Sequence, residues 1–144
     1  MSYLHYEKQI IHRDIKPPNI LWYDKGIIKI TDFNHAIELD KLVELKWKGN
    51  IGTPWFKAPE LLLDMPYSYG VDVWALGCVF EYMLTGDFIF RFETRSHALP
   101  RQDENTKRKK HLVAIFNQLD KPNEQIWPGI EKHEKFLQIE CPDS

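Results

Sequence analysis

The clearest pattern in the sequence is a helical spacing of apolar residues near the middle of the chain. Between residues 69 and 84 they recur at intervals of three and four, at Val71, Trp74, Ala75, Cys78, Val79, Tyr82 and Met83. This period predicts a helix. The opposite face is also apolar, with Val73, Leu76 and Phe80, so we expect the helix to be buried on all sides. Gly86 follows as a stop signal.

Two short apolar runs predict a β-hairpin before this helix. The runs cover residues 20–23 and 27–30, and the sequence Asp-Lys-Gly between them is typical of a turn. The outer ends of a hairpin lie side by side. We therefore expect the two flanking loops to bring Asp14, Asn19 and Asp32 into one neighbourhood.

Other segments carry weaker patterns. Residues 1–8 are interpreted as the end of a helix that makes apolar contacts through Tyr3, Leu4 and Tyr6, and residues 35–57 as irregular. A helical turn is expected at 59–63, where Pro is well placed at the start. Residues 93–111 are polar, include a basic run, and are interpreted as a surface insertion. A short helix is then expected to bury four residues, Leu112, Ile115, Phe116 and Leu119.

Composition narrows the class of protein. The 144 residues are 43% hydrophobic and 28% charged, with a net charge of -2, which is typical of one globular domain. This charge gives no reason to expect a nucleic acid or an acidic membrane as partner. The sequence shows neither a signal peptide nor a long apolar span, and its two cysteines, Cys78 and Cys141, have no metal-site spacing. We expect a nuclear or cytoplasmic protein.

The loop before the hairpin carries the groups that phosphoryl transfer needs. Residues 12–19 read H-R-D-I-K-P-P-N. Transfer from ATP requires a carboxylate to orient the attacking hydroxyl, a cation near the transferring group and oxygen ligands for a divalent metal. Asp14 is the candidate base and Lys16 the candidate cation. Asn19 offers a neutral oxygen to the metal, and Asp32 a charged one.

Four motifs together resemble those of protein kinases. Residues 12–19 match the catalytic loop H-R-D-L-x-x-x-N, with Ile15 for Leu. Residues 32–34, D-F-N, stand where the family has D-F-G, and residues 58–60 are its A-P-E motif. Residues 72–77, D-V-W-A-L-G, are similar to the family's central helix. The motifs occur in the family's order, and Lys16 followed by Pro is similar to Ser/Thr kinases.

The resemblance implies a fold and a function. The fold class would be α+β, a mainly helical kinase C-lobe with one small β-hairpin and with the N-lobe absent. Residues 1–144 would be a partial kinase domain with a polar insertion at about 93–111. The chain would be part of an ATP-dependent Ser/Thr kinase. The 144 residues by themselves would be inactive. The alternative is a catalytically inactive C-lobe remnant that acts as a protein-binding module.

The resemblance also implies roles for single residues. Asp14, Lys16 and Thr53 would be catalytic, with Thr53 bridging Asp14 and Lys16. The cofactors would be ATP and Mg²⁺, with Lys16, Asn19 and Asp32 at the ATP site and the last two holding the metal. Five residues would be structural: His12, Arg13, Phe33, Glu60 and Asp72. Glu60 would need a cationic partner, which the family places beyond these residues.

Two further segments resemble cyclin-dependent kinases. They are residues 52–63, G-T-P-W-F-K-A-P-E-L-L-L, and residues 115–129, which contain P-N-E and I-W-P-G. The implied partners are a protein substrate and a cyclin or other regulatory protein. The polar insertion and Lys57 are also similar to the divergent fungal kinases that activate cyclin-dependent kinases.

Two departures from the family pattern bear on activity and regulation. Asn34 replaces the glycine of D-F-G, and Asn tolerates a positive φ better than other residues, so we expect the loop to form. Arg13 is either a clamp for a phosphorylated loop or part of a structural ion pair. Between Asn34 and Gly52 there is no Ser, Thr or Tyr, which favours the ion pair. The loop would be ordered by a partner protein or by carboxylates such as Glu38, Asp40 or Glu44.

Overall fold

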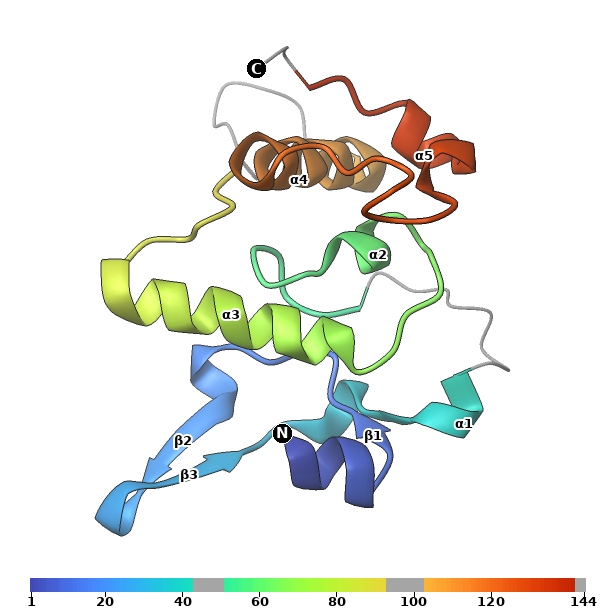
Figure 1. The fold of residues 1–144 in the computed structure, drawn as a ribbon. Helices are drawn as coiled ribbons and strands as arrows, with labels where there is room; N and C mark the ends of the chain where they lie inside the picture. The colour runs from blue at the N-terminus through green and yellow to red at the C-terminus, as the bar shows by residue number, and fades with distance from the viewer. Residues whose placement is uncertain (43–50, 93–102, 142–144) are drawn as a thin grey trace. The chain divides into compact units, whose positions relative to one another are not determined.

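The structure is a computed structural model that describes residues 1–42, 51–92 and 103–141. It divides into two compact units, Met1–Ile89 and Phe90–Ser144. The described residues form helices and short strands (Figure 1). Every predicted catalytic residue lies in the first unit.

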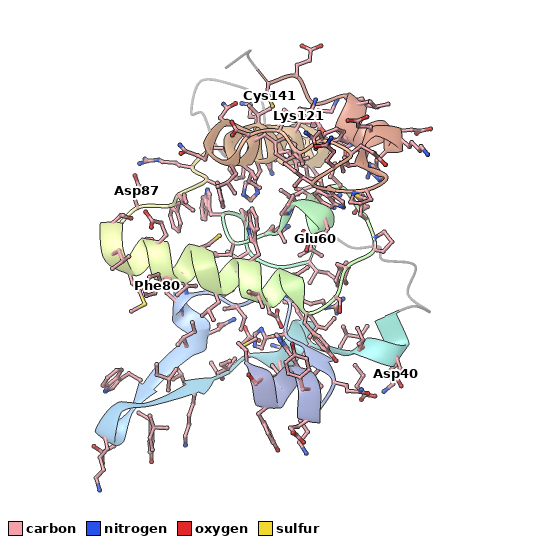
Figure 2. All side chains as sticks on the ribbon, viewed as in Figure 1. Asp40, Glu60, Phe80, Asp87, Lys121 and Cys141 are labelled. Atoms are coloured by element: carbon pink, nitrogen blue, oxygen red, sulfur yellow. The ribbon has the colours of Figure 1, made fainter. Side chains whose placement is uncertain are left out.

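Helix α3, Gly70–Thr85, is the predicted central helix, and its predicted existence and bounds are confirmed within one residue. It ends where predicted, because Gly86 adopts a left-handed φ of 76° and donates its N–H to Tyr82 O at 2.9 Å. One face is buried, and it includes Cys78, where burial raises the pKa of the thiol to about 12. The expectation of burial all round is wrong. Phe80, labelled in Figure 2, is 63% exposed, because the described residues pack against one face of the helix only.

The hairpin is formed by β2, Ile20–Tyr23, and β3, Ile27–Ile30, as predicted. The strands are antiparallel, with Ile20 opposite Ile30. At the turn, Lys25 and Gly26 both adopt positive φ, 59° and 79°, and Gly accepts such a conformation without steric cost.

A second strand pair was not predicted. It joins β1, Ile10–Ile11, to β4, Ile37–Glu38, in antiparallel register. Strands of two residues show no alternation from which a strand could be inferred. The consequence is a tie between the entry to the catalytic loop and the segment that follows Asp32. Helix α1, Leu39–Leu42, continues directly from β4.

The N-terminal segment forms a helical turn, Tyr3–Glu7, in keeping with the expected helix end. The expected tyrosine contacts form only in part: both tyrosines are largely exposed, but the Tyr6 ring meets the Tyr69 ring edge-on, with centroids 5.8 Å apart. The buried side chain is His5. Its burial is explained by a polar partner in the same unit, the carboxylate of Asp72.

The core of the first unit joins distant parts of the chain. The predicted helical turn forms as α2, Pro59–Leu62. Its Leu61 is buried with four other residues, Ile11, Ala58, Tyr67 and Val71. Burying such side chains stabilises a fold by about 1.5–3 kcal/mol each. This cluster therefore fixes the catalytic loop, which follows Ile11, against α2 and α3.

The second unit holds α4, Glu104–Leu119, and α5, Glu134–Leu137. Asp103 caps α4 by accepting from Thr106 N at 3.0 Å and from Thr106 Oγ1 at 2.7 Å. The predicted helix is therefore longer than expected and takes in the last part of the predicted insertion, whose residues 93–102 lie outside the described residues. Leu112, Ile115 and Phe116 are buried as predicted, but Leu119 at the helix end is 54% exposed. None of the described helices has the length and apolarity needed to cross a bilayer.

Candidate active site

A buried carboxylate on α3 holds the backbone of the catalytic loop. Asp72 is 0% exposed. Its Oδ2 accepts from His12 N at 2.8 Å, and its Oδ1 accepts from Arg13 N at 2.8 Å. Two successive N–H groups thus form a nest for the anion. Arg13 adopts a left-handed φ of 67° there, a strain that the surrounding contacts must offset.

His5 completes the surroundings of Asp72. Its Nε2 lies 2.9 Å from Asp72 Oδ2, and its ring stacks on Tyr69 with centroids 4.6 Å apart. This role of His5 was not predicted from the sequence. The only available signal was a histidine between two apolar residues, and its partner lies 67 positions away.

His12 is a packed core residue, as its expected structural role requires. Its Nε2 donates to Thr31 O at 2.9 Å, and its Nδ1 accepts from Asp14 N at 3.3 Å. The Phe33 ring meets it edge-on at 4.9 Å. His12 therefore ties the catalytic loop to the residues on either side of Asp32.

Asp14, Lys16 and Thr53 form one hydrogen-bonded cluster. Asp14 Oδ1 accepts from Thr53 N at 2.8 Å and from Thr53 Oγ1 at 2.7 Å. Asp14 Oδ2 accepts from Lys16 Nζ at 2.7 Å, and the same Nζ donates to Thr53 Oγ1 at 2.9 Å. The structure thus places Thr53 between Asp14 and Lys16, in the position that the resemblance implied.

These contacts set the charge of Asp14. Burial by itself raises the pKa of this carboxyl, but the hydrogen bonds from Lys16 and Thr53 and the charge of Lys16 outweigh it. The net result is a pKa below the usual value. Asp14 is therefore ionised at neutral pH and able to accept a hydrogen bond or a proton.

Gly52 lets Thr53 reach Asp14. Its φ is +84°, and a Cβ at this position would lie 2.7 Å from Arg13 O. Any other residue would push the two segments apart. The role of Gly52 was not predicted, because the sequence around a glycine in an irregular segment does not indicate which backbone atoms it contacts.

Asn19 and Asp32 lie at the same end of the hairpin. Asn19 accepts through its backbone oxygen from Thr31 N at 3.0 Å, and Asp32 follows directly. The Asn19 amide nitrogen donates to Asp14 O at 2.9 Å, which leaves the amide oxygen as a ligand. Asp32 adopts a left-handed φ of 63°, and its Oδ1 accepts from Asn34 Nδ2 at 2.8 Å.

This donor set fits Mg²⁺ that arrives with a nucleotide. It offers one carboxylate and one amide oxygen, both hard ligands, and the described residues contain no cluster of three or more His, Cys, Asp or Glu side chains that could hold a metal alone. Protein-bound Mg²⁺ usually keeps waters and takes one or two carboxylates together with substrate phosphates.

The arginine of the catalytic loop has neutral partners. Arg13 Nε donates to His35 O at 2.6 Å, and Arg13 Nη1 donates to Tyr67 Oη at 2.9 Å. Among the described residues Arg13 forms no ion pair, and since Glu44 lies outside them, the ion pair favoured for Arg13 stays a prediction. A carbonyl and a phenol hydroxyl engage two donors of the guanidinium without a carboxylate.

The carboxylates expected to order the loop have other roles. Glu38 pairs with Lys41 at 2.7 Å on the surface, and Asp40 Oδ1 accepts from Lys41 N at 2.8 Å. Glu44 lies outside the described residues. Glu60, labelled in Figure 2, belongs to α2, and burial raises the pKa of its carboxyl.

Comparison with known proteins agrees with this geometry. The family described as protein kinase domain matches residues 1–139. The chain is 33% identical to the serine/threonine-protein kinase SSN3 of Kluyveromyces lactis, over 96% of the chain and 23% of that relative. It is 38% identical to the serine/threonine-protein kinase PITSLRE of Drosophila melanogaster, over 90% of the chain and 12% of that relative.

A solved structure shows the same fold. The chain is similar, with a TM-score of 0.73 and 29% identity, to a protein in the crystal structure of the yeast RNA Pol II CTD kinase CTDK-1 complex. The match covers 96% of the chain and 40% of the solved one. The chain thus spans less than half of each relative named. The finer likeness to fungal kinases that activate cyclin-dependent kinases stays a prediction.

Proposed function

The chain belongs to the protein kinase family, and from this premise we propose that it carries the catalytic loop of a Ser/Thr kinase. The reaction is transfer of the γ-phosphate of ATP to a hydroxyl of a protein substrate. One observation carries the proposal. Asp14 is held ionised by Thr53 and Lys16 in a single hydrogen-bonded cluster, with each contact at 2.7–2.9 Å.

The residues would divide the chemistry as follows. Asp14 orients the substrate hydroxyl and accepts its proton as the oxygen attacks phosphorus. Lys16 places a positive charge beside the transferring group, and Thr53 fixes the distance between the two. Asn19 and Asp32 would hold the Mg²⁺ that accompanies ATP and neutralises phosphate charge. Such catalysis consists mainly of positioning and electrostatic stabilisation.

We further propose that the kinase is cyclin-dependent-kinase-like and acts with a cyclin or other regulatory protein, in the nucleus or the cytoplasm. Support comes from the segments 52–63 and 115–129 and from a solved relative whose structure is that of a complex. The protein substrate is a Ser- or Thr-containing segment that reaches Asp14 beside Thr53.

The test is radiolabel transfer from ATP to a generic protein substrate by the full-length gene product. We expect Asp14→Asn to lower kcat by about 10²–10⁴, the usual contribution of a positioned base. The matched control is Asp24→Asn, which makes the same change in the exposed hairpin turn and should leave kcat unchanged. Equal rates for Asp14→Asn and the parent would reject the proposal. Absence of any transfer by the parent would favour the alternative, a protein-binding module.

A further inference from the structure

The residue that departs from the family motif contacts the predicted metal ligand. Asn34 stands where the family has glycine, and its Nδ2 donates to Asp32 Oδ1 at 2.8 Å. The positive φ expected at residue 34 occurs at Asp32 instead, while Asn34 lies in the helical turn Phe33–His35. Glycine has no side chain and could not make this bond. The substitution therefore adds a contact to the site.

We propose that Asn34 is a positioning residue that fixes the Asp32 carboxylate and presents one oxygen, Oδ2, to the metal. The inference rests on the proposed function, because it takes Asp32 as a metal ligand. In the described residues Asp32 Oδ2 accepts no hydrogen bond, whereas Oδ1 is engaged by the amide. The hydrogen bond from the Asn34 amide thus occupies Oδ1 and leaves Oδ2 for the metal.

Fixing the carboxylate should strengthen metal binding. A free Asp side chain loses rotamer freedom when it binds an ion, and a partner that orients it beforehand reduces that loss. Removal of groups that orient metal ligands typically weakens metal affinity by about 10–100-fold. Asn34 donates this hydrogen bond to a residue only two positions earlier in the chain, so we expect its loss to affect Asp32 and not the rest of the fold.

The contact should also favour small cations. Mg²⁺ requires near-octahedral geometry, whereas Ca²⁺ accepts carboxylates through both oxygens. With Oδ1 held by Asn34, Asp32 can offer one oxygen without breaking a hydrogen bond. Removal of the amide frees the second oxygen. Discrimination against Ca²⁺ should therefore fall.

The experiment measures Mn²⁺ binding by electron paramagnetic resonance, in the full-length protein with a non-hydrolysable ATP analogue, and Ca²⁺ by competition. The variants are Asn34→Leu, which keeps the size and loses the amide, and Asn34→Gly, which restores the family residue. The control is Asn105→Leu on α4, which makes the same change at an exposed asparagine. Asp32→Ala serves as the reference for loss of the ligand.

We expect both Asn34 variants to bind Mn²⁺ about 10–100-fold more weakly and to lose discrimination against Ca²⁺, while Asn105→Leu matches the parent. A merely structural role for Asn34 would lower thermal stability without changing the ratio of Mn²⁺ to Ca²⁺ affinity, and that outcome overturns the inference. Parent-like Mn²⁺ affinity in both variants, with loss in Asp32→Ala, also overturns it and leaves the proposed function intact. Parent-like affinity in Asp32→Ala instead removes the metal assignment itself.

Discussion

The charge of Asp14 depends on a balance between burial and its hydrogen-bond donors. Burial raises its pKa, and Lys16 and Thr53 more than compensate. A carboxyl whose pKa is lowered by folding contributes stability above its unfolded pKa, and that stability is lost as pH falls through the folded pKa. Asp14 should accordingly stay active as a base at pH values where an unassisted buried carboxyl would be protonated.

Removal of the Lys16 charge should therefore shift the pH dependence of the reaction. In Lys16→Met the burial of Asp14 is opposed by Thr53 and by the longer contact from Asn19 Nδ2 at 3.4 Å, but no longer by a positive charge. The pKa of Asp14 should therefore rise, and the acid limb of the kcat/KM profile should move to higher pH. The measurement is a pH–rate profile of the full-length protein, with Lys25→Met in the hairpin turn as control. A variant with lower activity but an unmoved acid limb would contradict this account of Asp14.

The two proposed metal ligands, Asp32 and Asn19, should differ in their effect on nucleotide binding. Asp32→Ala removes a charged ligand and should abolish the Mg²⁺-dependent part of nucleotide binding, whereas Asn19→Ala removes a neutral one and should weaken it less. Titration of the full-length protein with a fluorescent nucleotide, with and without Mg²⁺, measures both. Asn19→Ala should also impair Asp14, because the Asn19 amide donates to Asp14 O. Parent-like Mg²⁺ dependence in both variants would refute the assignment.

At the scale of elements, periodic patterns predicted what the chain forms locally. The central helix and the hairpin were found from apolar spacing and a turn signal, and the hairpin correctly placed Asp32 beside Asn19. The partners of Arg13 and His5 were not predictable in this way. Tyr67 and Asp72 lie 54 and 67 positions from them, and such contacts depend on tertiary packing that no local pattern encodes.

Burial was predicted less well than secondary structure. The spacing around α3 marked Val73 and Phe80 as core, yet both are exposed in the structure. An apolar side chain favours burial, but whether it is buried depends on which other elements pack against that face of the helix. The strand pair β1–β4 was missed for a related reason, since two residues are too few to establish a period.

The link between α3 and the catalytic loop should be important for stability as well as activity. Asp72→Ala leaves the N–H groups of His12 and Arg13 and the ring of His5 without their acceptor. Each buried donor left without an acceptor costs about 1–3 kcal/mol, so the loss should amount to a few kcal/mol. We expect a loss of that size in chemical denaturation of the full-length protein and a large fall in kcat. Asp72→Asn should lie between this variant and the parent.

The matched control for this prediction is Asp24→Ala in the exposed hairpin turn, which should change stability by less than about 0.5 kcal/mol. An Asp72→Ala protein as stable as the control would mean that the carboxylate does not support the loop.

For the molecule as a whole, the site depends on segments that are far apart in sequence. The catalytic loop, the end of the hairpin, the segment at Thr53 and helix α3 each contribute contacts to the cluster around Asp14 and Asp72. Gly52 permits the closest of these approaches. The approach of the Thr53 segment to the catalytic loop is therefore one place where we expect regulation of the kinase to act.

Kinases commonly regulate this approach by phosphorylation of the intervening segment, which orders the segment by pairing the phosphate with arginines. Here residues 35–52 contain no Ser, Thr or Tyr, and Thr53 already binds Asp14 and Lys16. Two donors of Arg13 are engaged by Tyr67 and His35. Arg13 thus has hydrogen-bond acceptors in this structure without a phosphorylated residue.

We therefore expect activity to be independent of phosphorylation in this segment. Phosphatase treatment of the full-length, partner-bound protein should leave kcat unchanged, with mass spectrometry of the peptide that contains Thr53 to establish its state. Tyr67→Phe, which removes the hydroxyl acceptor of Arg13 and keeps the ring, should lower kcat, because the guanidinium keeps only the His35 carbonyl of its two hydrogen-bond acceptors. A large loss of activity together with loss of phosphate from Thr53 would refute the prediction. Parent-like kcat in Tyr67→Phe would show that the Tyr67 contact does not substitute for the phosphate.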